Sequence, residues 1–378
     1  MTDGAAEAIL PDAERIPHVA ALKRIFELWV MDRDFHDAYL ADPERALART
    51  GLDVDPEAVR LLLLRTLPED ASGWDDADRL PKTFIWYRDY LERRGRRNML
   101  ARTRELPADL RFRDWVQRQI RRCDREMGAR GRFMAHLPMA FELSSGCSVG
   151  CPFCGLSAGR LAGLYRHTDE NAGLWRDVLA AAHRVVGECV GKAPCYYATE
   201  PLDNPDYELF LEDYLAEFGR VPQTTTAVAL RNIERTRHLL QWGQAVREHF
   251  DRISVLSRAD FDAIISAFTP EELIFTDLLP QFREAPISTF IQAGRNRDDS
   301  QGIGSTIACV SGFVVNMFER SVRLVTPVAA SDEHPTGEQI FDTATFTDGV
   351  SFEDVLREMI ERHMQTTIGL ADLFATAR

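Results

Sequence analysis

The sequence predicts an α/β protein in which an N-terminal α-helical domain precedes a barrel or partial barrel of alternating strands and helices. Two observations support this prediction. Residues 1–137 carry apolar side chains mostly at helical spacing. After Pro138, short apolar runs alternate with amphipathic stretches, which is typical of parallel strands joined by right-handed helical crossovers.

The N-terminal part is predicted to form several helices. Apolar residues recur every three or four positions over 20–40, which indicates an amphipathic helix. Asp42 and Pro43 suit the cap and first turn of a second helix, and Gly51 suits its end. Further helices are predicted over 56–65, 83–104 and 109–127, and an acidic loop over 67–78.

The second part is predicted to alternate between strands and helices. The strands are predicted over 139–145, 194–199, 223–230, 252–256, 312–318 and 321–326, the last two as a hairpin or late barrel strands. The helices are predicted over 171–190, 206–218, 233–249, 259–267 and 352–368. The predicted domains are a helical segment 1–80, a helical connector 81–137, the partial barrel 138–330 and a C-terminal extension with a helix, 331–378.

Composition and charge restrict the partners of the chain. The 378 residues are 45% hydrophobic and 28% charged, as in ordinary globular proteins. Lys and Arg number 45 and Asp and Glu 59, a formal net charge of −14 that argues against nucleic acid or an anionic membrane as partner. Neither a signal peptide nor an apolar run of about 18 residues is present, so we expect a cytoplasmic protein.

The cysteines indicate a metal or redox site. Their number is odd, and three of the seven lie within eight positions, which does not suit a disulfide framework. Cys147, Cys151 and Cys154 have the spacing Cys-x3-Cys-x2-Cys, next to small residues such as Gly150 and Gly155. Three thiolates on one loop can hold three irons of a four-iron, four-sulfur cluster. Such clusters usually have four cysteines, so a set of three leaves one iron open to bind a substrate.

Zinc and a thioredoxin-type site fit the cysteines less well. A zinc site needs a fourth ligand, and the next histidine, His167, lies 13 residues after Cys154. A thioredoxin-type Cys-x-x-Cys pair leaves Cys147 unexplained. The spacing therefore favours the iron–sulfur cluster.

The cysteine spacing, with Phe153 before the third cysteine, resembles the signature of the radical S-adenosylmethionine (SAM) superfamily. The resemblance implies a partial (β/α)6 TIM-type barrel with the cluster loop after its first strand. It implies a [4Fe-4S] cluster on Cys147, Cys151 and Cys154, SAM on the open iron, and Phe153 beside the adenine. An external electron donor would reduce the cluster, and bound SAM would be cleaved to methionine and a 5′-deoxyadenosyl radical.

Other SAM contacts follow from the same resemblance. The Gly-Gly-Glu motif of the superfamily is replaced here by Ala198–Glu200, and Glu200 can accept a hydrogen bond from the SAM ammonium group. The predicted SAM-binding residues are Phe153, Thr199, Glu200, Thr225, Ser254 and Ser257. Glu200 could instead cap a turn before Pro201, and threonines are good strand formers in any protein.

Further regions point to a peptide substrate. Residues 29–64 resemble the nitrile-hydratase-like leader found on proteusin-type precursors of ribosomally made peptides. The blocks Ala198–Tyr207, Thr224–Ala227 and Ser311–Met317 resemble the radical SAM epimerases that act on such precursors. The resemblance covers about residues 20–340 and implies that a precursor peptide with a leader is the partner.

The resemblance also implies a reaction. The radical removes a Cα hydrogen from the peptide, and a cysteine thiol returns hydrogen from the opposite face to give a D-residue. Cys309 is the favoured donor because it lies just before the 312–318 strand in a glycine-rich approach. Cys123 and Cys189 lie on predicted helices and are expected to be structural, and Cys195 is expected to begin a strand at the end far from the cluster.

One position departs from the expected pattern. Thr326-Pro327 is followed by Val328, where the epimerases are expected to carry a cysteine. Without a donor thiol the radical would drive another modification, such as oxidation, crosslinking or backbone rearrangement. The sequence is also compatible with a non-catalytic leader-binding module that holds a structural metal, and with a radical enzyme that acts on a small molecule.

Overall fold

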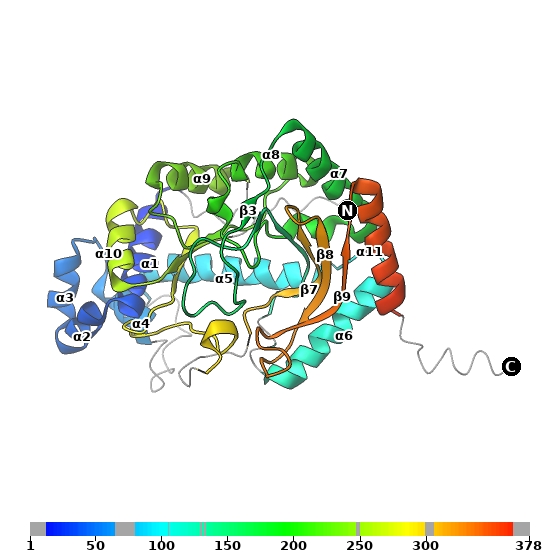
Figure 1. The fold of residues 1–378 in the computed structure, drawn as a ribbon. Helices are drawn as coiled ribbons and strands as arrows, with labels where there is room; N and C mark the ends of the chain where they lie inside the picture. The colour runs from blue at the N-terminus through cyan, green and yellow to red at the C-terminus, as the bar shows by residue number, and fades with distance from the viewer. Residues whose placement is uncertain are drawn as a thin grey trace, which may run out of the picture. The chain divides into compact units, whose positions relative to one another are not determined.

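The computed structural model describes residues 13–64, 80–104, 106–128, 131, 134–246, 250–298 and 306–365, so the predicted loop 67–78 lies outside the described residues. The described chain is a mixture of helices and strands (Figure 1). It forms two units, each assembled from segments that are distant in sequence. Unit 1 comprises the described residues of 1–101, 229–244 and 251–289, and unit 2 those of 102–228, 245–250 and 290–378.

Unit 1 is mainly helical. Its helices are α1 (Ile16–Met31), α2 (Arg33–Ala41), α3 (Pro43–Thr50), α4 (Pro56–Leu64), most of α5 (Lys82–Arg104), most of α9 (Ile233–Val246) and α10 (Arg258–Ala267). The single helix predicted over 20–40 is wrong, because the chain breaks at Asp32, which is extended. The Asp32 carboxylate accepts a hydrogen bond from Phe35 N at 2.9 Å and so caps α2. Asp42 and Gly51 cap the two ends of α3, as predicted.

Unit 1 also contains a parallel strand pair. Strands β5 (Asp251–Val255) and β6 (Thr276–Pro280) pair in parallel, with α10 between them in the chain. The strand predicted over 252–256 and the helix over 259–267 are confirmed to within one residue, whereas β6 was not predicted. The Lys23 ammonium on α1 donates to the Thr276 carbonyl at 2.7 Å and fixes the start of β6.

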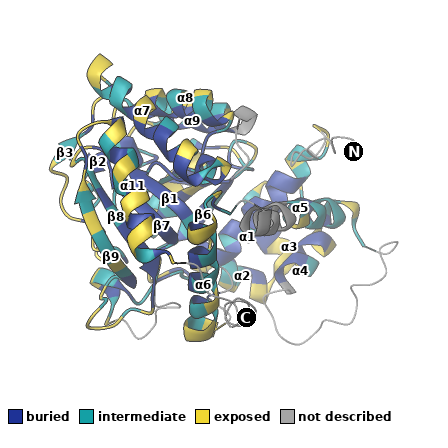
Figure 2. Cartoon of the chain, turned by 90° about the vertical axis from the view of Figure 1, so that its right-hand side faces the viewer, coloured by how far each residue is buried: buried dark blue, intermediate teal, exposed yellow. Residues whose placement is uncertain are grey.

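Unit 2 is built around a four-stranded sheet in the order β1-β7-β8-β9. The strands are β1 (Leu137–Glu142), β7 (Val310–Asn316), β8 (Ser321–Pro327) and β9 (Glu338–Thr345). Strands β1 and β7 are parallel, and β8 is antiparallel to both of its neighbours, β7 and β9. The predicted hairpin is therefore confirmed. Strands β1 and β7 are buried almost throughout (Figure 2), whereas β9, which was not predicted, is largely part-exposed.

Helices pack on this sheet and on one another. They are α6 (Leu110–Met127), α7 (Asp169–Val186), α8 (Tyr207–Phe218) and α11 (Gly349–His363). Helix α7 contacts both α8 and α11, and α11 shows a buried and an exposed face (Figures 1 and 2). The Phe141 ring of β1 lies edge-on to Trp175 of α7, with centroids 5.0 Å apart, and anchors the helix to the strand. Helix α7 ends at Val186, and a 3-10 turn, η3 (Glu188–Lys192), replaces the rest of the helix predicted over 171–190.

The strand predicted over 194–199 is wrong. Phe141 N donates to the Pro194 carbonyl at 2.8 Å, as a neighbouring strand would require. However, Ala198 N donates at 2.8 Å to the side chain of Glu142, not to a backbone carbonyl. A side-chain acceptor has therefore replaced the strand partner, and the segment forms bends.

The strand predicted over 223–230 is reduced to β4, Thr225–Thr226, for a similar reason. Ala227 N donates to the Glu200 carboxylate at 2.8 Å, and Val228 N donates to the Thr226 hydroxyl at 3.0 Å. In the part of the chain that the structure describes, the strands form sheets of two to four members, and no closed barrel is found. The partial (β/α)6 barrel stays a prediction.

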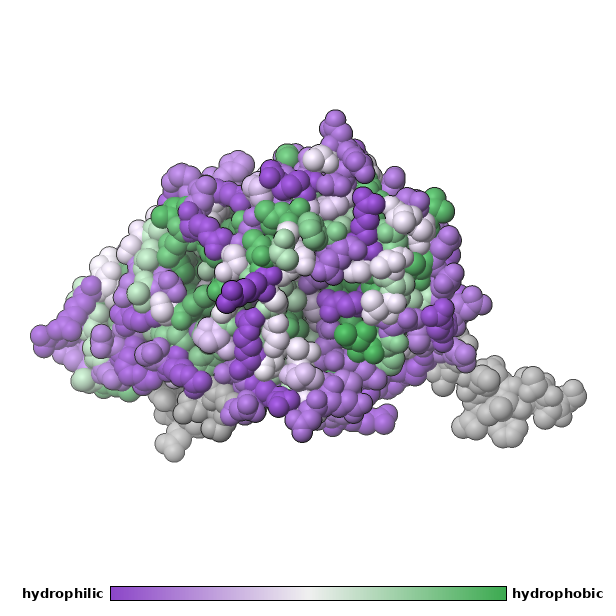
Figure 3. Space-filling view, viewed as in Figure 1, coloured by the Kyte–Doolittle hydropathy of each residue, from purple (hydrophilic) through white to green (hydrophobic). Residues whose placement is uncertain are grey.

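The face of the molecule drawn in Figure 3 is mainly polar. In Figure 3 hydrophilic residues cover most of the visible face, and apolar residues form separate patches. Among the described helices, none combines the length and the apolar character needed to cross a bilayer.

Candidate functional site

The three clustered cysteines lie on a loop of unit 2 that follows β1. This loop, residues 147–160, is called the cysteine loop below. Short strands β2 (Ser144–Ser145) and β3 (Gly163–Leu164) pair antiparallel at its base. Cys147 N donates to the Gly159 carbonyl at 2.9 Å, and Leu161 N donates to the Cys147 carbonyl at 3.2 Å. The backbone thus closes the loop on itself.

The loop thiols are half-buried and form no disulfide. Backbone amides donate to two of the sulfurs, Val149 N to Cys147 Sγ and Ala158 N to Cys154 Sγ, both at 3.4 Å. Burial raises the pKa of the Cys147 thiol. A hydrogen bond from Cys151 to Cys154 raises the pKa of the first thiol and lowers that of the second.

The donor set fits an iron–sulfur cluster by its chemistry. Among the described residues, no three His, Cys, Asp or Glu side chains converge closely enough to hold one metal ion. A cluster, in contrast, presents a separate iron to each thiolate, so its ligands need not meet at one point. Hydrogen bonds to the sulfurs are among the features that tune iron–sulfur sites. Three disulfide-free thiols with amide donors are compatible with such a cluster, whose presence stays a prediction.

Two carboxylates of the 198–207 segment tether the cysteine loop. Asp203 accepts from Ser148 twice, from the amide at 2.8 Å and from the hydroxyl at 2.5 Å. Asp206 accepts from the Arg166 guanidinium at 2.7 Å and from His167 N at 2.9 Å, just beyond the loop. The Arg166 hydrogen bond lowers the pKa of Asp206, which keeps that carboxylate charged. Asp203 thus holds the start of the loop, and Asp206 holds the chain beyond its end, after β3.

Glu200 is buried, with 3% of its surface exposed. Its carboxylate accepts from Leu202 N at 3.1 Å, from the Thr226 hydroxyl at 2.6 Å and from Ala227 N at 2.8 Å. Burial raises its pKa to about 7 in spite of these three donors. Glu200 therefore joins β4 to the 198–203 segment and caps the turn η4 (Pro201–Asp203), and its contact with SAM stays a prediction.

Three other residues of unit 2 were predicted to bind SAM: Phe153, Thr199 and Thr225. The Phe153 ring lies edge-on to Phe290, with centroids 5.0 Å apart. The Thr225 hydroxyl is hydrogen-bonded to the Tyr196 hydroxyl at 2.6 Å. Thr199 is part-exposed.

The two predicted serines belong to unit 1, whereas the other predicted site residues belong to unit 2. Ser257 caps α10, because its hydroxyl accepts from Asp260 N at 3.0 Å. Ser254 is a part-exposed residue of β5. Their contacts with SAM stay predictions.

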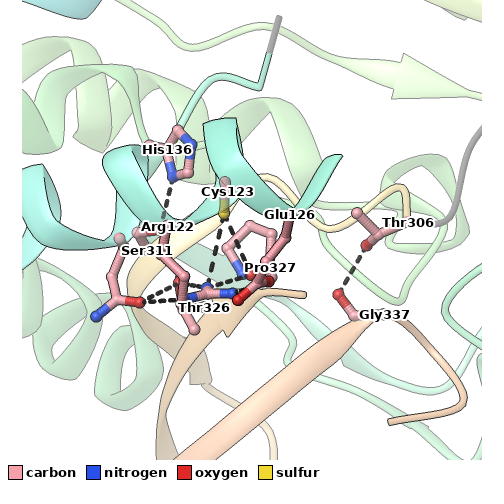
Figure 4. A network of polar contacts seen from close by, with 10 residues as sticks. Arg122, Cys123, Glu126, His136, Thr306, Ser311, Thr326, Pro327 and Gly337 are labelled. Atoms are coloured by element: carbon pink, nitrogen blue, oxygen red, sulfur yellow. Dashed lines mark hydrogen bonds and ion pairs between the residues drawn. The ribbon is translucent and has the colours of Figure 1, made fainter. Parts of the chain in front are cut away.

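Three of the four cysteines outside the loop are buried. Cys123 on α6 donates to the Pro327 carbonyl at 3.4 Å, next to the Arg122 guanidinium (Figure 4), and burial raises its pKa to about 11. Cys189 lies in η3, not in an α-helix, and donates to the Val186 carbonyl at 3.5 Å. Burial also raises the pKa of Cys195. These three thiols are enclosed by protein.

Cys309 differs from these three thiols. It is part-exposed and lies immediately before β7, where its carbonyl accepts from Leu137 N at 2.8 Å. Its side chain packs against a buried apolar group that includes Tyr197 and Val310. Val328, the position suspected for a donor cysteine, is buried instead. Cys309 is thus the accessible thiol of unit 2 that the cluster motif does not use.

A buried polar network beside Cys309 was not predicted. The Tyr197 hydroxyl donates to the Glu338 carboxylate. Arg323 lies 3.5 Å from Glu338 and 3.5 Å from Glu142, and burial raises the pKa of both carboxyls. Glu142, an acidic residue inside the apolar run 139–145, was the signal in the sequence that could have pointed to the network.

Comparison with known proteins identifies a relative but no activity. No protein-family model matches the chain, and no solved structure matches it. The uncharacterized protein y4wI from Sinorhizobium fredii (strain NBRC 101917 / NGR234) is 38% identical over 370 residues, which cover 91% of this chain and 70% of that protein.

Proposed function

The chain belongs to the same family as the uncharacterized protein y4wI of Sinorhizobium fredii, and from its own residues we propose that it is a radical SAM enzyme that converts L-residues of a ribosomally made precursor peptide into D-residues. One observation carries the proposal. Unit 2 combines a loop of three disulfide-free thiols with a fourth, separate thiol that is also accessible.

The cysteine loop would hold the cofactors. Cys147, Cys151 and Cys154 would bind a [4Fe-4S] cluster, which with SAM and an external electron donor supplies a 5′-deoxyadenosyl radical. The amide groups of Val149 and Ala158 stabilise thiolate sulfur at two of these ligands. All seven cysteines lack a disulfide, which favours a reducing compartment and supports a cytoplasmic location.

Cys309 would return the hydrogen atom. Its S–H bond breaks, and a C–H bond forms on the face of the peptide Cα opposite to the one that lost hydrogen. The thiyl radical left on Cys309 then takes one electron from the external reductant and one proton from solvent, which restores the thiol. Among the non-motif cysteines, only Cys309 is exposed enough to reach a bound peptide.

The test uses the chain reconstituted with iron and sulfide without oxygen, then mixed with dithionite, SAM and the leader-bearing peptide encoded beside its gene. Iron, sulfide and 5′-deoxyadenosine are measured. In heavy water the peptide should gain one deuteron per changed residue, because the Cys309 thiol exchanges with solvent. Cys309→Ala should still form 5′-deoxyadenosine but give no D-residue, and Cys189→Ala, a buried control, should behave as the wild type.

Other results would replace the proposal. Deoxyadenosine and a changed peptide without deuterium would mean another radical modification, such as oxidation or crosslinking. One zinc per chain with neither iron nor sulfide would mean a structural metal in a leader-binding module. A chain that cleaves SAM yet does not bind the peptide would point to a small-molecule substrate.

A further inference from the structure

One exposed arginine of unit 2, Arg295, donates hydrogen bonds to backbone carbonyl groups of the cysteine loop. The Arg295 guanidinium donates to the Cys151 carbonyl at 3.0 Å and also to the Ala158 carbonyl. The Arg295 amide donates to the Cys154 carbonyl at 3.1 Å. A single residue thus satisfies three carbonyl groups spread over the stretch that carries two of the three predicted iron ligands.

The residue before it has no room for a side chain. Gly294 has φ +57°, and a Cβ atom there would lie 2.4 Å from the Cys154 carbonyl oxygen and 2.5 Å from that of Gly155. The loop and this segment are therefore in backbone contact. Gly294 N also donates to the Pro335 carbonyl at 2.7 Å, which ties the segment to the connection between β8 and β9.

The arginine also brings a charge. Its guanidinium is bonded to the Cys151 carbonyl, so a positive charge lies beside the thiols. A cluster on three thiolates is anionic, and one-electron reduction makes it more so. Since the net charge around a cluster helps to set its reduction potential, a cation at this place favours the reduced form.

We propose that Arg295 is the positioning residue that holds residues 151–158 in the shape the cluster requires and that raises the reduction potential of that cluster. The inference rests on the proposed function, because it assumes that the cysteine loop binds a cluster. It adds a residue that the cysteine spacing does not contain. Arg295 touches neither iron nor SAM in this proposal; it acts through the loop backbone and through its charge.

Two substitutions separate the hydrogen bonds from the charge. Arg295→Gln removes both the planar guanidinium, which donates to two carbonyl groups at once, and the positive charge. Arg295→Lys keeps the charge, but one ammonium group cannot span the Cys151 and Ala158 carbonyls as the planar fork does. Arg297→Gln is the matched control, because Arg297 lies two residues further on and faces Asp332 at 3.3 Å and the Ser331 carbonyl at 3.4 Å instead of the loop.

The experiment measures iron release to a chelator and the midpoint potential of the reconstituted cluster, followed by electron paramagnetic resonance without peptide. Arg295→Gln should release iron about 10-fold faster or more, as losses of supporting residues around metal ligands do, and its potential should be more negative. Arg295→Lys should release iron faster with a potential near that of the wild type. Arg297→Gln should match the wild type in both.

The outcomes distinguish the two levels of the proposal. Wild-type protein that holds no iron overturns the proposed function and this inference with it. Wild-type protein that holds a cluster, with Arg295→Gln and Arg295→Lys equal to it in both measurements, overturns this inference alone. Circular dichroism of each variant establishes that it is folded, and if Arg295→Gln is not, Arg295→Lys decides the point.

Discussion

The guanidinium of Arg323 on β8 lies 3.5 Å from the carboxylate of Glu142 on β1, across the intervening strand β7 of the unit 2 sheet. It lies equally close to Glu338, so one cation neutralises two buried acids. Removing the shared partner of buried charges is costly, because each remaining charge is left without water and without a counter-ion. Substitution of Arg323 therefore tests how much these ion pairs contribute to the stability of the sheet.

Arg323→Met should lower the free energy of unfolding by about 3 kcal/mol, at the low end for a broken buried ion pair because Arg323 is itself part-exposed. Burial already raises the pKa of Glu142 and Glu338, and loss of the cation raises both further. The folded state then binds more protons than the unfolded state, so the loss should be larger at neutral than at mildly acidic pH. Denaturant unfolding at the two pH values measures it.

Arg357→Met is the control for this prediction. Arg357 pairs with Glu353 at 2.7 Å on the exposed side of α11. Exposed pairs of this kind contribute at most about 1 kcal/mol. A loss in Arg323→Met no greater than that in Arg357→Met would contradict the role given to the network.

Local sequence patterns suffice for some elements of the fold and not for others. The hairpin over 310–327 and helix α8 were predicted because their own residues carry the apolar periodicity. The strand over 194–199 was wrong because its Ala198 amide is bound by a side chain 56 positions earlier, Glu142. No periodicity within the segment contains that contact.

In the candidate site, too, local patterns could be predicted from the sequence and long-range contacts could not. The spacing of Cys147, Cys151 and Cys154 is local and points to a common loop, which the structure contains. The grip of Arg295 on that loop joins residues more than a hundred positions apart, and an isolated arginine in a loop gives no signal in the sequence. Which thiol outside the motif is accessible depends on tertiary packing: the sequence favours Cys309 as the donor, and the structure adds that Cys309 is part-exposed whereas Cys195 is buried.

Glu200 predicts a pH dependence of stability. Its pKa is raised by burial to about 7 in the folded chain, against an ordinary value of 4.5. The folded state therefore keeps a proton that the unfolded state loses, and the stability contributed by this group should fall as pH rises from about 4.5 to about 7. The shift corresponds to roughly 3 kcal/mol at most.

Glu200→Gln should remove this part of the pH dependence in the cluster-free chain. The amide oxygen can still accept from Thr226 and Leu202, and it does not titrate. The free energy of unfolding is measured across that pH range for both proteins. Parallel curves for the two proteins would show that Glu200 is charged in the folded state and that its burial has no such effect.

The seven cysteines should fall into a group that reacts with a thiol reagent and a group that does not. In the folded, cluster-free chain, iodoacetamide should modify Cys309 and the three loop cysteines, which are part-exposed, and should spare the other three, which are buried: Cys123, Cys189 and Cys195. The reagent needs both access and thiolate, and burial denies Cys123 and Cys195 both of these. Peptide mass spectrometry measures each site, and the denatured chain provides full labelling. Equal labelling of Cys195 and Cys309 would remove the reason for choosing Cys309 as donor.

The closure of the cysteine loop can be tested at Gly146, which precedes Cys147. Gly146 has φ +80°, and a Cβ atom there would lie 2.1 Å from the Arg160 carbonyl oxygen. Gly146→Ala should therefore lower the free energy of unfolding by more than about 1 kcal/mol, since alanine suits neither the backbone conformation nor the space. It should also reduce the iron bound after reconstitution, because the displaced Arg160 lies at the end of the loop that carries the ligands.

Gly159→Ala is the matched control on the same loop. A Cβ atom at Gly159 meets no atom within 4 Å, so the substitution should change stability by no more than about 0.5 kcal/mol and leave iron binding unchanged. Calorimetry and iron analysis compare the two variants with the wild type. Gly146→Ala could be less stable than Gly159→Ala and still bind as much iron. That result would mean that the backbone at the base of the loop contributes to folding but is not needed for the three thiols to bind the cluster.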